Sequence, residues 1–266
     1  MLILAIINSE MRVWVVLVWF LFSGLAASGQ ANLLTCYALT DGKGIDENIK
    51  KIENLINKLD TKAKKSDRQF LKNVFNLTHR QFLKEYDQYA GFGDIFKDGR
   101  YDCLTATALY SVLLSELGYQ HTIIETNFHI FLLVASAEGK VLMESTDPLG
   151  GFEYRQNKIE DRIKAYKADQ ESASKNGYSY SYNLFEEVSP QELNGLLYYN
   201  QCVKAFNQQQ WGKAIENLES AKLFYNSPRI VEMENLLVTI IASVELEKVQ
   251  QATPSGSTQR IAQNNK

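Results

Sequence analysis

The segment from Cys103 to Ser145 constrains the fold more than any other part of the chain, because its hydrophobic period changes once, at Gly118. Before this glycine, apolar residues recur at helical spacing and predict a helix over residues 103–117, with Gly118 as its left-handed cap. After it, the alternation is typical of strands, expected over residues 121–126, 128–135 and 140–145. The chain is therefore predicted to be α+β, with a helix packed on a small antiparallel sheet.

Helical patterns flank this segment on both sides. Upstream, two amphipathic helices are expected over residues 45–60 and 66–89. Downstream, a polar helix over residues 158–170 is expected to cover the core. Further on, Ser189-Pro190 has the pattern of a helix N-terminus, with proline at the first helical position.

The N-terminus has the parts of an export signal. Met11-Arg12 is followed by the apolar run VWVVLVWFLF and then by small residues, with Ala27 at position −3 and Gly29 at position −1 of a cleavage site. Residues 1–29 are therefore predicted to be a signal peptide of a periplasmic or secreted protein. If translation begins at Met1, the preceding LILAII lengthens the run, and an uncleaved membrane anchor is the alternative.

A candidate catalytic constellation lies within the central segment. Cys103 is expected in the first turn of its helix, where unpaired backbone N–H groups and the helix dipole favour a thiolate. In a hairpin with an even loop, His129 on one strand and Glu144 on the next point the same way, whereas Asp147 joins them only if the strand has already ended. The order of thiol, imidazole and carboxylate predicts a nucleophile, its base and an orienting acid, with Glu144 ranked slightly ahead of Asp147.

Acyl-transfer chemistry also needs donors for an oxyanion. The backbone N–H of Cys103 is one expected donor, and Gln88 or Tyr89 is the candidate for the second. The other two histidines, His79 and His121, have no evident partners in the sequence and are interpreted as surface residues.

The stretch YDCLTATALYSVLLSELGY, followed by HIFLLV and VLMEST, resembles the core of the bacterial transglutaminase-like superfamily over about residues 95–152. This resemblance implies a papain-like fold of a helix and a sheet, and a Cys, His, Asp triad in that chain order. Ala106 and Ala108 fit the family's cysteine segment, whereas Tyr101 replaces a small residue. Glu144-Ser145-Thr146 matches the family's Asp-x-Thr with Glu in place of Asp.

The stretch LYYNQCVKAFNQQQWGKAIENLESAKLFYNSP resembles one tetratricopeptide unit, with matching residues Trp211, Ala214, Leu218 and Ala221. A transglutaminase-like core followed by such helices is similar to the arrangement of SirB-type proteins. Four regions are thus expected: a signal peptide (1–29), a core with N-terminal helices (30–185), tetratricopeptide-like helices (186–249) and a disordered polar tail (250–266).

These features predict an exported cysteine enzyme that transfers or hydrolyses the acyl group of a peptide or amide substrate. The alternative is an inactive module of the same fold that binds a peptide or protein partner in the cell envelope, through the C-terminal helices and the tyrosine-rich tract at residues 177–182.

Other function classes are disfavoured by composition and spacing. A formal net charge of −3 gives no field that would attract nucleic acid. No cofactor is expected, and Cys103, His129 and Glu144 lack the close ligand pairs of a metal motif. The odd count of 3 cysteines leaves at least one thiol outside any intramolecular disulfide, and Cys202 is interpreted as an apolar residue buried in a helix.

Overall fold

A computed structural model of the chain describes residues 33–41, 45–60, 66–175 and 184–252. The predicted signal peptide, the tyrosine-rich tract and most of the predicted tail lie outside the described residues. The helices are α2 (Ile45–Asp60), α3 (Asp67–Phe82), α4 (Asp94–Lys97), α5 (Cys103–Glu116), α6 (Gln156–Lys175), α7 (Pro190–Asn207), α8 (Trp211–Phe224) and α9 (Pro228–Ala252). The strands are β1 (Glu85–Tyr86), β2 (Arg100–Tyr101), β3 (His121–Thr126), β4 (Ile130–Ser136), β5 (Gly139–Met143), β6 (Phe152–Glu153) and β7 (Phe185–Val188).

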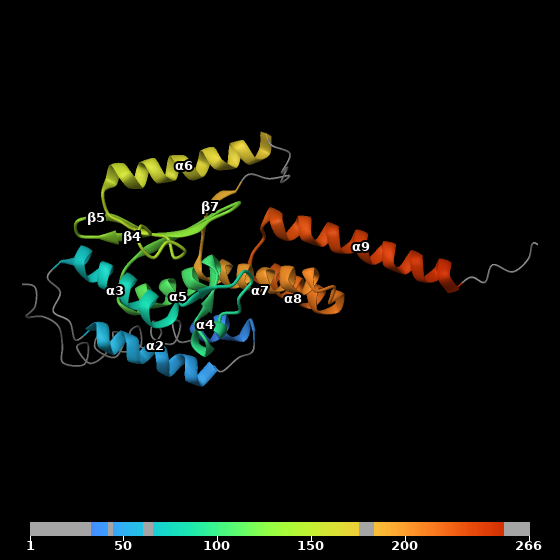
Figure 1. Ribbon diagram of the computed structural model, residues 1–266, viewed down its shortest axis with the longest axis horizontal. Helices are drawn as coiled ribbons and strands as arrows, with labels where there is room; N and C mark the ends of the chain where they lie inside the picture. The colour runs from blue at the N-terminus through green and yellow to red at the C-terminus, as the bar shows by residue number, and fades with distance from the viewer. Residues whose placement is uncertain (1–32, 42–44, 61–65, 176–183, 253–266) are drawn as a thin grey trace, which may run out of the picture.

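The main sheet is antiparallel, with the strand order β6-β5-β4-β3-β7. Helix α5 covers one face of it and α6 covers the other (Figure 1). The larger hydrophobic core lies on the α5 side and includes Leu132 and Val134 of β4. A smaller core on the α6 side joins Phe131 and Leu142 to Ile159. The predicted α+β class, with a helix packed on a small antiparallel sheet, is confirmed.

Helix α5 begins at the predicted residue and ends one residue before the predicted end. At its N-terminus, Asp102 and Thr105 form a capping box, and the Asp102 carboxylate accepts a hydrogen bond of 2.8 Å from the Thr105 backbone N–H. At its C-terminus, Gly118 has a φ of 75°, a left-handed conformation that glycine adopts without steric cost. Cys103 is therefore the first residue of the helix, as predicted.

The β4–β5 hairpin fixes the direction of the predicted site residues. Ser136 pairs with Gly139 across a turn at residues 137–138, so the loop is even. Side chains alternate along each strand, which places His129 on the same face as Phe131, toward α6. The same rule places Glu144 on that face too.

Three regions differ from the sequence-based prediction. Helix α3 ends at Phe82 instead of continuing to residue 89, because the chain turns there and β1 pairs with β2 in a short parallel ladder. Strand β7, which begins at the predicted boundary at residue 185, pairs with β3, and β6 pairs with β5, so the sheet has five strands instead of three. Helix α9 continues to Ala252, into the stretch predicted to be a disordered tail.

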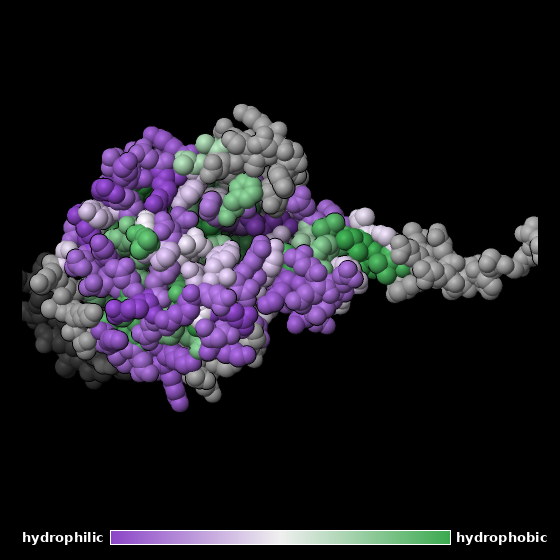
Figure 2. Space-filling view, in the orientation of Figure 1, coloured by the Kyte–Doolittle hydropathy of each residue, from purple (hydrophilic) through white to green (hydrophobic). Residues whose placement is uncertain are grey.

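The C-terminal helices form a separate layer at one side of α5. Helices α7 and α8 approach closely at Gly195, where a Cβ would lie only 2.6 Å from that of Tyr225. Helix α9 then extends away from the core (Figure 1) and presents apolar surface to solvent (Figure 2), including Leu236 and Val238. Among the described residues, no helix combines the length and the hydropathy that a membrane span requires.

Candidate active site

A cleft of about 340 Å³ lies beside the first turn of α5. Cys103, His129 and both oxyanion candidates, Gln88 and Tyr89, line this cleft. Another part of its lining comes from α7 and from Arg229 of α9. The fold therefore brings the predicted nucleophile and the predicted base to one cleft, which the C-terminal helices help to enclose.

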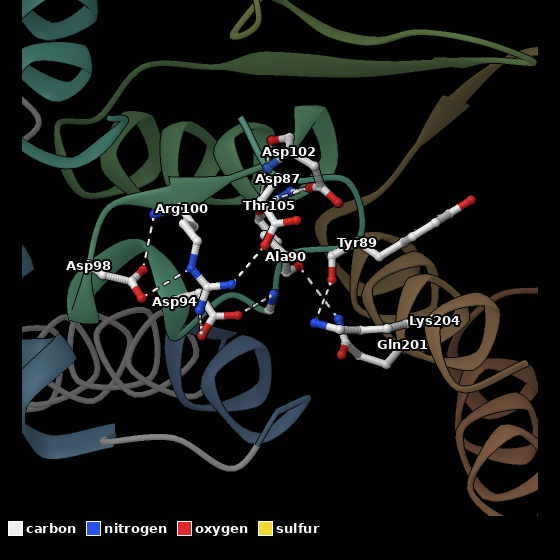
Figure 3. Close-up of polar contacts among 11 residues, drawn as sticks. Asp87, Tyr89, Ala90, Asp94, Asp98, Arg100, Asp102, Thr105, Gln201 and Lys204 are labelled. Carbon is white, nitrogen blue, oxygen red and sulfur yellow. Dashed lines mark hydrogen bonds and ion pairs between the residues drawn. The ribbon is translucent and has the colours of Figure 1, made fainter. Parts of the chain in front are cut away.

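The wall that carries Gln88 and Tyr89 is fixed by polar contacts (Figure 3). Arg100 forms ion pairs with Asp87 at 2.7 Å and with Asp98 at 3.0 Å. Tyr89 has a φ of 65°, and its carbonyl accepts a hydrogen bond of 3.2 Å from Nζ of Lys204 on α7. The position of this wall thus depends on α7 as well as on the core.

The surroundings of Cys103 keep its thiol protonated. The pKa of the Cys103 thiol is raised to about 12, mainly by burial and in smaller part by the charge of the adjacent Asp102. The backbone N–H groups of Cys103 and Leu104 and the charge of Arg229 lower the pKa, but to a smaller extent. The expectation of a thiolate in the resting protein was therefore wrong, because desolvation outweighs the helix N-terminus.

His129 is paired with a carboxylate. Its Nδ1 lies 3.7 Å from Oε1 of Glu144, which confirms that the two side chains share a face. The backbone N–H of His129 donates to Oγ1 of Thr126 at 2.8 Å, and the His129 carbonyl accepts from the Thr126 N–H, also at 2.8 Å. These bonds fix the start of β4. The imidazole is 37% exposed, and His129 is among the residues that line the cleft.

The two acid candidates have different surroundings. Glu144 contacts His129, and its second oxygen, Oε2, accepts a hydrogen bond from the hydroxyl of Tyr166. The carboxylate of Asp147 instead accepts hydrogen bonds from the backbone N–H groups of Leu149, at 3.1 Å, and Gly150, at 2.7 Å. Asp147 shapes the loop after β5, whereas Glu144 is the acid placed beside the imidazole.

In the described part of the chain, no hydrogen bond joins the Cys103 thiol to His129. The His129 ring packs against Tyr166 on the α6 face of the sheet, with the ring centroids 4.8 Å apart, whereas α5 lies on the opposite face. Resting enzyme sites often have long or missing catalytic hydrogen bonds that form only with substrate. The thiol and the imidazole thus share a cleft without being bonded to each other.

Several residues around the cleft were missed by sequence reasoning. Asn200 of α7 donates to Oδ2 of Asp102 at 2.5 Å. Nε of Arg229 lies 2.8 Å from Oε1 of the buried Glu125, whose Oε2 accepts a hydrogen bond of 2.7 Å from the Tyr225 hydroxyl. The one sequence signal for these contacts was Glu125, a charged residue inside the strand predicted at 121–126. Its partners could not be predicted because they come from the distant C-terminal segments.

The two remaining histidines are not surface residues, contrary to the prediction. His79 is 7% exposed and packs among aromatic rings, including that of Phe75. Burial is the main reason that its pKa is lowered, although a hydrogen bond to the Ser145 backbone acts in the opposite direction. His121 is partly buried, and its Nε2 lies 2.8 Å from Oγ of Ser111. Helical periodicity alone did not reveal that the face carrying His79 is covered.

Fold and site together define an α+β protein whose cleft holds a thiol and an imidazole that is paired with a carboxylate. A scan against protein-family models and searches of curated proteins and of solved structures found no match. Across the described residues, no group of three or more His, Cys, Asp or Glu side chains is placed to hold a metal ion.

The rate at which iodoacetamide alkylates Cys103 should rise about tenfold per pH unit between about pH 7 and 10. The reason is that only the thiolate reacts and the pKa of the thiol is raised to about 12. The rate is measured for each cysteine separately, by mass spectrometry of peptides from protein sampled over time. The variant Cys103→Ser verifies the assignment of the modified peptide. A rate that is already constant above about pH 6 would show a preformed thiolate and contradict the burial effect.

Proposed function

We propose that the chain is a transglutaminase-like cysteine enzyme that transfers the acyl group of a peptide or amide substrate to water or to an amine. The observation that carries this proposal is the common cleft of Cys103, at the N-terminus of α5, and His129, whose Nδ1 faces Glu144. Cysteine nucleophiles need such a base and an orienting carboxylate. The proposal extends to an exported protein with a papain-like core and tetratricopeptide-like C-terminal helices.

The reaction begins with a neutral thiol. When a substrate carbonyl enters the cleft, Nε2 of His129 takes the thiol proton as sulfur attacks the carbonyl carbon, and the carbonyl electron pair moves to oxygen. The backbone N–H of Cys103 stabilises this oxyanion, together with a donor from the segment of Gln88 and Tyr89. The C–N bond then breaks, the imidazolium protonates the leaving amine, and water or a second amine releases the acyl group from sulfur. Throughout, Glu144 keeps the Nδ1–H tautomer of the imidazole.

A library of peptides with a thiol-reactive electrophile, such as a vinyl sulfone, tests this proposal on the wild-type chain. We expect selected peptides to modify Cys103, as found by intact mass and peptide mapping, and Cys103→Ala to remove the modification. The matched control is Cys202→Ala, since Cys202 is completely buried in α7 and outside the cleft. If every peptide labelled all cysteines slowly and at equal rates, the proposed enzymatic function would be rejected.

A second candidate function is peptide binding without catalysis. The observation that favours it is the raised pKa of the Cys103 thiol, since a partly buried, neutral thiol beside a carboxylate is a poor nucleophile. In this case the cleft, with its walls from the core and from α7, holds a peptide or a segment of a partner protein. Calorimetry separates the two functions, because a binding module retains a peptide intact whereas an enzyme acylates or cleaves it.

A further inference from the structure

The geometry points to Tyr166 of α6 as a positioning residue of the proposed acyl-transfer site, one that holds both Glu144 and the imidazole of His129. This inference rests on the proposed function and adds a member to its machinery. Helix α6 appeared from sequence to be only a polar cover of the core. Tyr166 is instead 8% exposed, and it faces the sheet within the smaller hydrophobic core.

Tyr166 contacts both members of the imidazole–carboxylate pair at once. Its hydroxyl donates a hydrogen bond to Oε2 of Glu144. Its ring lies against the ring of His129, with 4.8 Å between centroids and 31° between planes. Its ring also packs near Phe131, with 5.1 Å between ring centroids, so its own position is fixed by the core.

The two oxygens of Glu144 have separate roles. Oε1 faces Nδ1 of His129 at 3.7 Å, and Oε2 is held by Tyr166 and lies 3.7 Å from Nη1 of Arg162. Burial and the neighbouring carboxylate raise the pKa of Tyr166, so its hydroxyl stays protonated and remains a donor. Fixing Oε2 in this way orients Oε1 toward the imidazole.

Arg162 gives the same loop a second attachment to α6. Its Nη2 donates a hydrogen bond of 3.0 Å to the carbonyl of Gly150, in the loop that follows Glu144. Arg162 and Tyr166 are four positions apart and therefore lie on one side of the helix. Helix α6 thus supports the acid from behind, on the side opposite to α5.

The test is Tyr166→Phe, which removes the hydroxyl and keeps the ring. With the electrophilic peptide that modifies Cys103 best, we expect the maximal rate of inactivation to fall about tenfold, with the half-saturating peptide concentration unchanged, since general-base catalysis supplies about 10²- to 10⁴-fold and only part of it is lost. The matched control is Tyr154→Phe, outside the cleft, which should react like wild type. Arg162→Gln should lower the maximal rate of inactivation by a smaller factor, and it replaces Tyr166→Phe as the test if that variant does not fold.

A second readout is independent of any peptide. Nitrogen-15 NMR of the neutral imidazole of His129 reports which nitrogen carries the proton, and Tyr166→Phe should shift the tautomer population away from Nδ1–H. Unchanged labelling together with an unchanged tautomer would overturn the role of Tyr166. If the wild-type chain itself is not modified at Cys103, the proposed function fails instead, and the tautomer still shows whether Tyr166 controls the imidazole.

Discussion

Replacement of Arg229 by methionine is expected to lower the free energy of unfolding at pH 8 by about 3 to 5 kcal/mol, the typical cost of leaving one member of a buried ion pair without its partner. Glu125 is 2% exposed, and Nε of Arg229 lies 2.8 Å from its Oε1. Arg229 also donates to the carbonyl of Thr126 at 3.0 Å. Methionine keeps most of the apolar volume and removes the charge. Urea unfolding followed by circular dichroism measures the effect.

The pH dependence of this loss has a defined sign. Burial raises the pKa of Glu125, and Arg229 opposes this rise. Without Arg229 the pKa rises further, so the folded variant holds a proton that the unfolded chain releases above its ordinary pKa of 4.5. The free energy of unfolding of the variant is then greatest below pH 4.5 and falls as the pH rises. Its deficit relative to wild type should therefore be smaller at about pH 5 than at about pH 8. The double variant Glu125→Gln/Arg229→Met should recover most of the loss. A deficit that persists in the double variant would mean that the pair is not its cause.

Replacement of His129 by alanine should slow the reaction of Cys103 with the best electrophilic peptide by about 10²- to 10⁴-fold, the contribution of a general base. The physical reason is that the thiol is neutral at rest, with its pKa raised to about 12, so the proton must be removed as sulfur attacks. Stopped reactions analysed by intact mass give the rate.

The control for this variant is His121→Gln, because His121 lies outside the cleft and contacts Ser111. We expect its rate to equal that of wild type. A rate in His129→Ala within about twofold of wild type would remove the base from the proposed mechanism and favour the binding module.

The elements closest to the candidate site were predictable, because their signals are local. Apolar residues at helical spacing and Gly118 predicted α5, although the helix is buried on all sides over residues 105–114, and alternation with an even turn predicted the hairpin. Strand β7 was missed because two of its residues are exposed glutamates and its partner, β3, lies about 60 residues earlier in the chain. Helix α3 was predicted too long because helical periodicity does not mark the point where a two-residue strand begins.

The relative placement of His129 and Glu144 was predictable, but the protonation state of the Cys103 thiol was not. Sequence order and strand parity placed His129 beside Glu144. The pKa of Cys103 was predicted in the wrong direction, since it depends on how much of the chain covers the thiol and on the charge of Asp102. Tyr166 was missed for a related reason, because a tyrosine in a polar helix carries no sign of the carboxylate it will meet.

The carboxylate of Asp102 links the two halves of the molecule through its two oxygens. Oδ1 caps α5 at the Thr105 N–H, and Oδ2 accepts the hydrogen bond from Asn200 of α7. Any ligand that tilts α7 would consequently disturb the residue that precedes Cys103, and with it the electrostatic potential at the sulfur atom. The charge nearest the Cys103 sulfur is thereby held by the core and by the helical layer together.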